Sequence, residues 1–296
     1  MSLSGEEFTI ESHGYRAVIT EAGATLRLLQ HAGRDLIVGH GAGEMATAGR
    51  GQHLIPWPNR IRDGRYTFAG SSYQLPISEP ARTNASHGLT RWAAWAGVQE
   101  SSDCVRMLYP MMAQPGYPWA LDLAVTYQVD EDGLAVVVQA HNVSDTPAPF
   151  AYGAHPYLTA GTALIDDAWL CFAAREEQLV DPERMLPTGT RPVAGTEADF
   201  ATARRIGDQR LDTAFGLDSP ARVTLRDESG VGVELWGDAS MGWLQIYTAD
   251  SPPIQRSGLA VEPMTAPPDA FNSGTDLVVL QPGQRHACQW GIRALG

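Results

Sequence analysis

Two titratable side chains in this sequence are each followed directly by a proline and preceded by an apolar stretch. These residues are His155, after residues 150–154, and Glu262, after residues 258–261. Proline moves the preceding residue away from helical geometry, so both side chains are predicted to end strands. An imidazole exchanges protons near neutral pH, and burial gives a carboxyl group the raised pKa that suits a general base. The pattern favours acid–base chemistry over the alternatives of a structural histidine and a solvated glutamate.

Polar side chains beside turn residues mark three further stretches. Asn59 and Arg60 share the first, His87 and Arg91 share the second, and Asp212 occupies the third. Strand frameworks often present their binding groups at such positions. A guanidinium group offers a planar set of donors to sugar hydroxyls or to developing negative charge. Each residue also has an ordinary explanation, as a surface arginine, a loop histidine or a turn cap.

Several enzyme classes are excluded by what the sequence lacks. All 21 basic residues are arginine, because the chain contains no lysine. Schiff-base aldolases, pyridoxal-phosphate enzymes and P-loop phosphate binders each need a lysine amine. The motifs of zinc proteases, α/β-hydrolases, protein kinases and dinucleotide-binding proteins are also missing. Acid–base catalysis and ligand binding remain.

Charge and cysteine content indicate the expected partners and location. The formal net charge of −13 repels nucleic acids and anionic membranes. The three cysteines are widely spaced and include no C-x-x-C pair, which is typical of a reducing compartment. The N-terminal residues lack the apolar core of a signal peptide, and no apolar run approaches the length of a membrane span. We therefore expect a cytoplasmic protein whose partner is a small molecule.

The elements that must position these residues are strands. Apolar and polar residues alternate along many short segments, and 30 glycines and 20 prolines separate them. Helical patterns are scarce, with residues 268–271 predicted as at most a short turn. We predict one all-β domain over residues 1–296, a large antiparallel β-sandwich. The predicted strands are residues 15–20, 25–30, 65–69, 72–75, 105–109, 121–129, 134–140, 223–226, 231–236, 243–247, 259–262, 277–280 and 287–292.

Five short motifs, taken together, resemble the aldose 1-epimerase (galactose mutarotase-like) family in identity, order and spacing. The resemblance runs from about Tyr15 to the C-terminus and implies the large antiparallel supersandwich of that family, with one open sugar cleft. It also implies interconversion of the α and β anomers of a hexose without a cofactor. The motifs are Asn59-Arg60-Ile61, Asn84-Ala85-Ser86-His87-Gly88, Ala154-His155-Pro156-Tyr157, Leu211-Asp212 and Val261-Glu262-Pro263.

The resemblance assigns a role to each matching residue. Glu262 is expected to take the proton of the C1 hydroxyl, and His155 to protonate the ring oxygen. Arg60, His87 and Asp212 are expected to hold the sugar, and Asn59 and Arg91 lie in or beside the same motifs. No metal or cofactor is implied, and the partner is a small sugar, bound by a monomer or homodimer.

Departures from the family pattern leave the substrate open. His87-Gly88 is followed by Leu89-Thr90-Arg91-Trp92, where galactose mutarotases usually have a second glycine. A hexose 6-phosphate is an alternative to the favoured neutral aldose, because Arg60, Arg82 and Arg91 could receive a phosphate. A second alternative is a non-catalytic carbohydrate-binding protein. A third is a metal-dependent hydrolase or isomerase with His87, His155, Asp212 and Glu262 as ligands.

Overall fold

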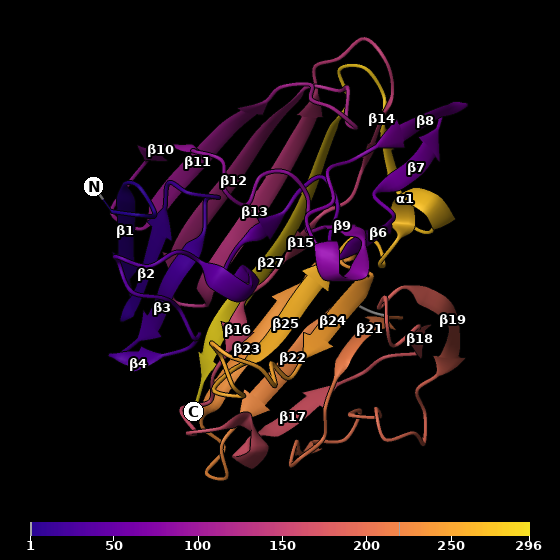
Figure 1. Ribbon diagram of the computed structural model, residues 1–296. Helices are drawn as coiled ribbons and strands as arrows, with labels where there is room; N and C mark the ends of the chain where they lie inside the picture. The colour runs from indigo at the N-terminus through magenta and orange to yellow at the C-terminus, as the bar shows by residue number, and fades with distance from the viewer. Residues whose placement is uncertain (1, 219) are drawn as a thin grey trace.

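The structure is a computed structural model that describes residues 2–218 and 220–296, and it shows an all-β protein built from antiparallel sheets (Figure 1). All the predicted strands are present, with ends shifted by up to three residues. The predicted large antiparallel architecture is confirmed. Nine strands form one large sheet, in the order β10 (Ala96–Gln99), β11 (Cys104–Met111), β12 (Leu121–Asp130), β13 (Gly133–Asn142), β27 (Arg285–Leu295), β23 (Gly232–Gly237), β22 (Arg222–Arg226), β17 (Trp169–Phe172) and β20 (Arg204–Arg205).

A second large sheet has eight strands and carries most of the polar residues of interest. Its order is β19 (Pro187–Pro192), β18 (Glu176–Val180), β21 (Asp212–Gly216), β24 (Trp243–Tyr247), β25 (Leu259–Met264), β15 (Gly153–Ala154) and β5 (His53–Leu54), and β16 (Tyr157–Leu158) also pairs with β25. The strands β24 and β25 therefore lie at its centre.

Smaller sheets surround these two. A four-stranded sheet contains β1 (Glu7–Ser12), β2 (Tyr15–Thr20), β3 (Leu26–His31) and β4 (Arg34–Asp35). Three two-stranded sheets pair β6 (Arg60–Arg62) with β9 (Asn84–Ser86), β7 (Arg65–Phe68) with β8 (Ser71–Gln74), and β14 (Ala148–Phe150) with β26 (Val278–Leu280). Helical segments in the described residues are short: α1 (Ala270–Ser273) and the 3₁₀ turns η1 (Thr47–Gly49), η2 (Pro80–Arg82) and η3 (Ile165–Asp167). None of these helices is long and apolar enough to cross a membrane.

The three predicted hairpins, β7–β8, β12–β13 and β22–β23, are all present. In the hairpin of β12 and β13, Gly133 has a φ of +115°, which favours glycine. A Cβ atom at Gly133 would lie 2.5 Å from the carbonyl oxygen of Ile292 on the neighbouring strand β27. Glycine at this turn therefore allows the central strands of the nine-stranded sheet to pack closely.

The core is formed by side chains from both large sheets. Along β12, the odd-numbered residues from Leu121 to Val129 are buried, as the two-residue repeat of a strand requires. Val136 from the nine-stranded sheet and Leu244 and Val261 from the eight-stranded sheet belong to the same apolar cluster. Every residue of β25 is buried, because this strand is central in its sheet. A titratable side chain on β25 is thus held away from water.

One buried histidine belongs to this core and not to a cleft. The Nδ1 atom of His53 lies 2.7 Å from the hydroxyl of Tyr152, which also accepts a hydrogen bond from the indole of Trp290. Burial lowers the pKa of His53 to about 3, so the ring is neutral at neutral pH. His53 is therefore a structural residue that joins the two large sheets.

Candidate active site

A cleft of about 450 Å³ lies where the eight-stranded sheet meets the β6–β9 pair. The residues that the sequence singled out come from distant parts of the chain, yet all of them line this cleft. They are Asn59, Arg60, His87, Arg91, His155, Asp212 and Glu262. Two further lining residues, Glu79 and Gln245, were not identified from the sequence.

His155 and Glu262 meet because the strand beside β25 is interrupted. Both β15 and β16 pair with β25, and His155 and Pro156 fall in the gap between them. The backbone N–H of Val261 donates to the carbonyl of Pro156 across this gap. The Nε2 atom of His155 lies 3.2 Å from Oε1 of Glu262, and the two residues are only 5% and 2% exposed. A buried imidazole and a buried carboxyl group are therefore in direct contact.

The prediction that Glu262 ends a strand is wrong. The strand β25 continues through Pro263 to Met264, so the carboxyl group lies inside it. Proline has no N–H and is tolerated in a sheet only where no ladder hydrogen bond is needed. Pro263 meets this condition because it faces the gap between β15 and β16. The prediction for His155 is confirmed, since this residue directly follows β15.

Burial moves the pKa values of the two groups in opposite directions. It lowers the pKa of His155 to about 3, and the charge of Arg91 contributes in the same sense. Burial also raises the pKa of Glu262 well above its usual value, assisted by Asp212 and opposed by Arg60. Among the described residues, neither Nδ1 of His155 nor Oε2 of Glu262 has a hydrogen-bond partner. These shifts favour the uncharged forms of both groups.

The chemistry of this pair depends on whether one proton lies on Glu262 or on His155. A neutral imidazole beside a carboxylic acid contains the same number of protons as an imidazolium beside a carboxylate. Burial favours the first form, because it penalises charge on both partners. Moving the proton from Oε1 to Nε2 produces an acid and a base that are adjacent and face the same cleft. The pair is thus suited to donating a proton to one ligand oxygen while accepting a proton from another.

Asp212 is held in the cleft by Gln245. The side-chain amide of Gln245 donates to Asp212 Oδ1 at 2.6 Å, and its carbonyl oxygen lies 3.4 Å from Nδ2 of Asn59. Gln245 is directly opposite Glu262 in the pairing of β24 with β25. A polar residue in the middle of the apolar strand 243–247 was the available sequence signal. Burial raises the pKa of Asp212, while Arg60 and Gln245 oppose that shift.

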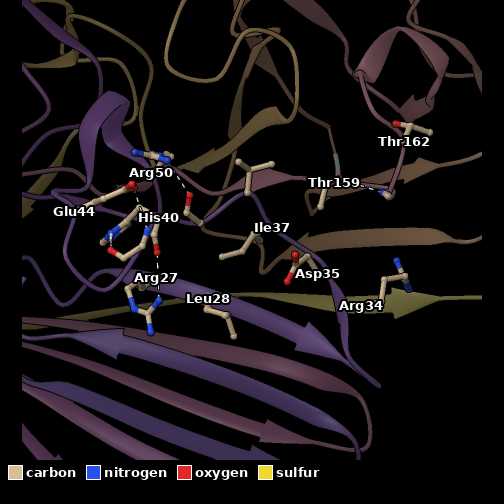
Figure 2. Close-up of a pocket in the computed structure, with 14 residues that line it drawn as sticks. Arg27, Leu28, Arg34, Asp35, Ile37, His40, Glu44, Arg50, Thr159 and Thr162 are labelled. Carbon is tan, nitrogen blue, oxygen red and sulfur yellow. Dashed lines mark hydrogen bonds between the residues drawn. The ribbon is translucent and has the colours of Figure 1, made fainter.

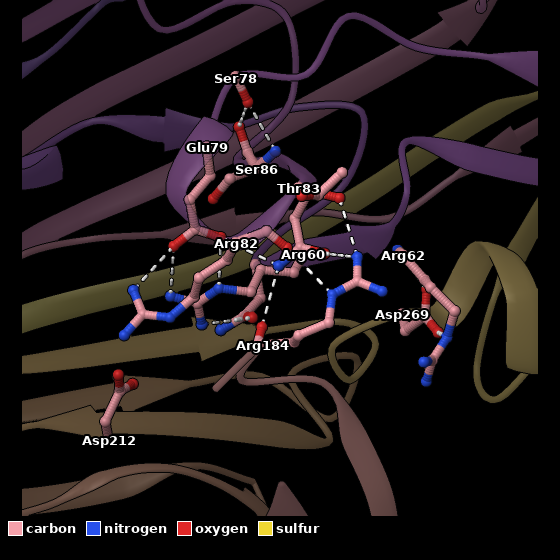
Figure 3. Close-up of polar contacts among 12 residues, drawn as sticks. Arg60, Arg62, Ser78, Glu79, Arg82, Thr83, Ser86, Arg184, Asp212 and Asp269 are labelled. Atoms are coloured by element: carbon pink, nitrogen blue, oxygen red, sulfur yellow. Dashed lines mark hydrogen bonds and ion pairs between the residues drawn. The ribbon is translucent and has the colours of Figure 1, made fainter. Parts of the chain in front are cut away.

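Arg60 reaches the cleft through the short β6–β9 pair, in which it lies opposite Ser86. Its guanidinium group forms a two-point ion pair with Glu79, with nitrogen–oxygen distances of 2.8 and 3.0 Å. Arg82 approaches the same carboxylate at 3.2 Å. Figure 3 shows this cluster with Asp212 facing it from the opposite side. Arg60 and Arg82 therefore share one counter-charge.

His87 and Arg91 form the remaining wall. The ring of His87 meets that of His155 edge to face, with centroids 5.5 Å apart, and burial lowers its pKa well below the usual value. The guanidinium of Arg91 lies 5.9 Å from the ring centre of Trp92, and burial lowers its pKa. Within residues 2–218 and 220–296, no acidic side chain pairs with Arg91. Arg91 thus offers the cleft an uncompensated positive charge.

A larger cavity, of about 560 Å³, lies beside the candidate site (Figure 2). Ala48 and Gly49 line the cleft, whereas Arg50 lines this second cavity, so one short segment separates them. Two of its arginines are engaged in structural contacts: Arg27 pairs with Glu7, and Arg50 donates to the carbonyls of Thr47 and Gly39. The acid–base pair is found only in the smaller cleft.

The hypothesis of a metal site gains no support from the geometry. Among the described residues, no three histidine, cysteine or acidic side chains gather as metal ligands. His155 and Glu262 are in contact, but Asp212 is directed to Gln245 and His87 packs against the ring of His155.

Comparison with known proteins identifies the family of this chain. The family model for aldose 1-epimerase matches residues 6–292. This chain belongs to the aldose 1-epimerase family. Among relatives in the family, the uncharacterized protein YihR of Escherichia coli K12 is 35% identical over 99% of this chain and 94% of its own length. The galactose mutarotase of Rattus norvegicus is 32% identical, over 50% of this chain and 44% of its own.

Solved structures of family relatives share the fold. An aldose epimerase homologue from C. elegans superimposes with a TM-score of 0.85 and 22% identity, covering 98% of this chain and 99% of its own. The galactose 1-epimerase of Lactobacillus acidophilus gives a TM-score of 0.81 and 23% identity, covering 97% and 94%. The predicted galactose mutarotase-like fold is therefore confirmed.

Proposed function

We propose that this protein is an aldose 1-epimerase that interconverts the α and β anomers of a hexose. The observation that carries the proposal is the 3.2 Å contact between His155 and Glu262 in an accessible cleft. The two oxygens that exchange protons in this reaction, the C1 hydroxyl and the ring oxygen, are bonded to the same carbon. An acid and a base side by side suit that pair of oxygens better than groups facing each other across the ring.

The reaction follows from the positions of the two groups. Ionised Glu262 removes the proton of the C1 hydroxyl, and His155 gives a proton to the ring oxygen as the bond from C1 to that oxygen breaks. The open-chain aldehyde then rotates about the bond between C1 and C2. In closure, Glu262 returns its proton to the carbonyl oxygen and His155 removes the proton from the attacking hydroxyl. No atom is gained or lost, and both side chains regain their starting states.

The surrounding polar residues would hold the sugar. Asn59, Arg60, His87 and Asp212 line the cleft and offer donors and acceptors to sugar hydroxyl groups. The charge of Arg60 also lowers the pKa of Glu262 against the effect of burial, which helps this group to act as a base.

Polarimetry of freshly dissolved α-glucose and α-galactose tests the proposal. The protein is expected to accelerate the decay of optical rotation above the spontaneous rate, in proportion to its concentration. The alternative of a carbohydrate-binding protein predicts heat of sugar binding in calorimetry with no acceleration. The epimerase proposal would be contradicted if added protein left the decay of optical rotation unchanged, both for neutral and for phosphorylated hexoses.

Gly49 provides a test of how tightly His155 must be held. Its φ is +77°, and a Cβ atom there would lie 2.8 Å from Cδ2 of His155. Gly49→Ala is expected to displace the imidazole and lower kcat/KM for anomerisation by about tenfold or more, because small misplacements of catalytic groups are costly. Gly161→Ala is the matched control, since its φ is +83° with no atom within 4 Å. Equal activity losses in the two variants would show that backbone strain, and not the clash with His155, is responsible.

Arg91 favours a hexose 6-phosphate as a second candidate substrate. A guanidinium without a counter-charge in a half-buried cleft is costly unless a ligand supplies the missing anion. Arg60 and Arg82 are less available, because both already contact Glu79. A phosphate held at Arg91 would leave the acid–base pair free for the same reaction at C1.

The expected result for Arg91→Gln concerns the choice between substrates. If a phosphate binds at this residue, the ratio of kcat/KM for glucose 6-phosphate to that for glucose should fall roughly tenfold to a hundredfold, because a charge-assisted hydrogen bond is lost. Polarimetry on both sugars measures this ratio. Arg191→Gln, which removes an arginine of β19 outside the cleft, should leave it unchanged. An unaltered ratio in Arg91→Gln would leave the neutral hexose as the substrate.

A further inference from the structure

Among the acidic residues that line the cleft, Glu79 accepts the most side-chain hydrogen bonds. Its carboxylate accepts hydrogen bonds from Arg60 Nε at 2.8 Å, Arg60 Nη2 at 3.0 Å, Asn84 Nδ2 at 3.1 Å and Arg82 Nη1 at 3.2 Å (Figure 3). Its side chain is 19% exposed and lines the cleft. One carboxylate thus organises two arginines and an asparagine at the substrate site.

Glu79 remains ionised in this position. Burial alone would raise its pKa, but hydrogen bonds from Arg60, Asn84 and Arg82, together with the charge of Arg60, bring the pKa below its usual value. A persistent negative charge is needed here, because two guanidinium groups would otherwise face each other in a half-buried space. The charges of Arg60 and Arg82 are therefore partly cancelled before any ligand arrives.

The contacts with Glu79 also decide which part of Arg60 faces the ligand. Two of its three nitrogens, Nε and Nη2, are taken by the carboxylate. The third, Nη1, has only a long contact of 3.5 Å to Oδ1 of Asn59. Arg60 is 13% exposed at its side chain, so it cannot easily change direction without losing these contacts. Nη1 is thereby left as a donor with a fixed direction.

A second set of contacts holds Glu79 itself. Its backbone N–H and carbonyl are tied to Asn84 on β9 by an isolated bridge. The side chain of Asn84 donates to the carbonyl of Arg184, whose guanidinium in turn contacts Asp63 at 2.7 Å. The position of the carboxylate is therefore fixed from the side facing away from the cleft.

We propose that Glu79 is a positioning residue for sugar binding, which aims Nη1 of Arg60 into the cleft and offsets the charge of the two arginines. This inference rests on the proposed epimerase function. Arg60 also lowers the pKa values of Glu262 and Asp212. Its charge remains when Glu79 is replaced, so we expect the effect of Glu79 on sugar binding and not on the proton transfers.

The test is Glu79→Gln, which keeps the shape of the side chain but removes its charge and one acceptor. With glucose or galactose, KM is expected to rise roughly tenfold to thirtyfold, while kcat changes by less than about threefold. Glu79→Asp keeps the charge but is too short to hold both arginines, and we expect an intermediate KM. A KM within about twofold of wild type in Glu79→Gln would overturn the proposal.

Glu234→Gln is the matched control. Glu234 is also buried and also contacts two arginines, Arg222 and Arg293, but it lies on β23 outside the cleft. Both glutamine variants are expected to lose some thermal stability, and only Glu79→Gln should change KM. Equal changes of KM in both variants would show that the effect is merely structural and would also overturn the proposal.

A structural measurement that needs no substrate distinguishes a failure of this inference from a failure of the proposed function. Wild-type protein that leaves the anomers unchanged would contradict the epimerase function but not the role of Glu79. A crystal structure of Glu79→Gln would then decide: we expect the Arg60 guanidinium to leave its place beside Asn59. If Arg60 kept its position in this variant, Glu79 would not be the residue that positions it.

Discussion

Glu262→Gln is expected to lower kcat for hexose anomerisation by about 10²–10⁴-fold, the usual contribution of a positioned general base. Glutamine has nearly the same shape as glutamate but cannot take the proton of the C1 hydroxyl. The carboxyl group lies inside β25 with its Oε1 atom 3.2 Å from His155, whereas the carboxylate of Asp212 in the same cleft is engaged by Gln245. Polarimetry at saturating sugar measures the loss.

Two further measurements make this result specific. Sugar binding by calorimetry should persist, and the variant should be at least as stable as wild type at neutral pH, because burial penalises ionised Glu262 and not glutamine. Glu177→Gln, at another buried glutamate of the eight-stranded sheet that pairs with Arg191, should retain full activity. A Glu262→Gln variant with wild-type kcat would remove this residue from the mechanism.

His155→Gln is expected to cause a loss of similar size, about 10²–10⁴-fold in kcat, because the ring oxygen then lacks a proton donor when its bond to C1 breaks. The amide of glutamine can still contact Glu262, so the local packing is largely kept. His141→Gln, on β13 and outside the cleft, is the control for a change of histidine. Retained activity in His155→Gln would mean that another group protonates the sugar.

The pH dependence of kcat/KM should also change shape. In wild type, the active pair shares one proton. A second proton is added as the pH falls towards about 3, the lowered pKa of His155, and the shared proton is lost above the raised pKa of Glu262. The profile should therefore fall on both sides. In His155→Gln only Glu262 of the pair is left to titrate, and the residual rate should rise with pH through its pKa without an alkaline decline from the pair.

Much of the candidate site was predictable from residue types and their immediate neighbours. Apolar–polar alternation identified the long strands, because a two-residue repeat is a local property of the chain. The prolines after His155 and Glu262 drew attention to both residues, although the strand at Glu262 continues further than predicted. Strands of only two residues, such as β5, β16 and β20, are too short to show any repeat, and the sequence does not predict them.

Residue types and their order along the chain were enough to indicate the family, the antiparallel architecture and the residues that gather at one cleft. Three contacts became apparent only in the folded molecule: His155 with Glu262, Gln245 with Asp212, and Glu79 with Arg60. They could not be predicted because they depend on the register between segments far apart in the chain. Local periodicity indicates which face of a strand is buried, but the partner strand and its alignment follow from packing of the whole core.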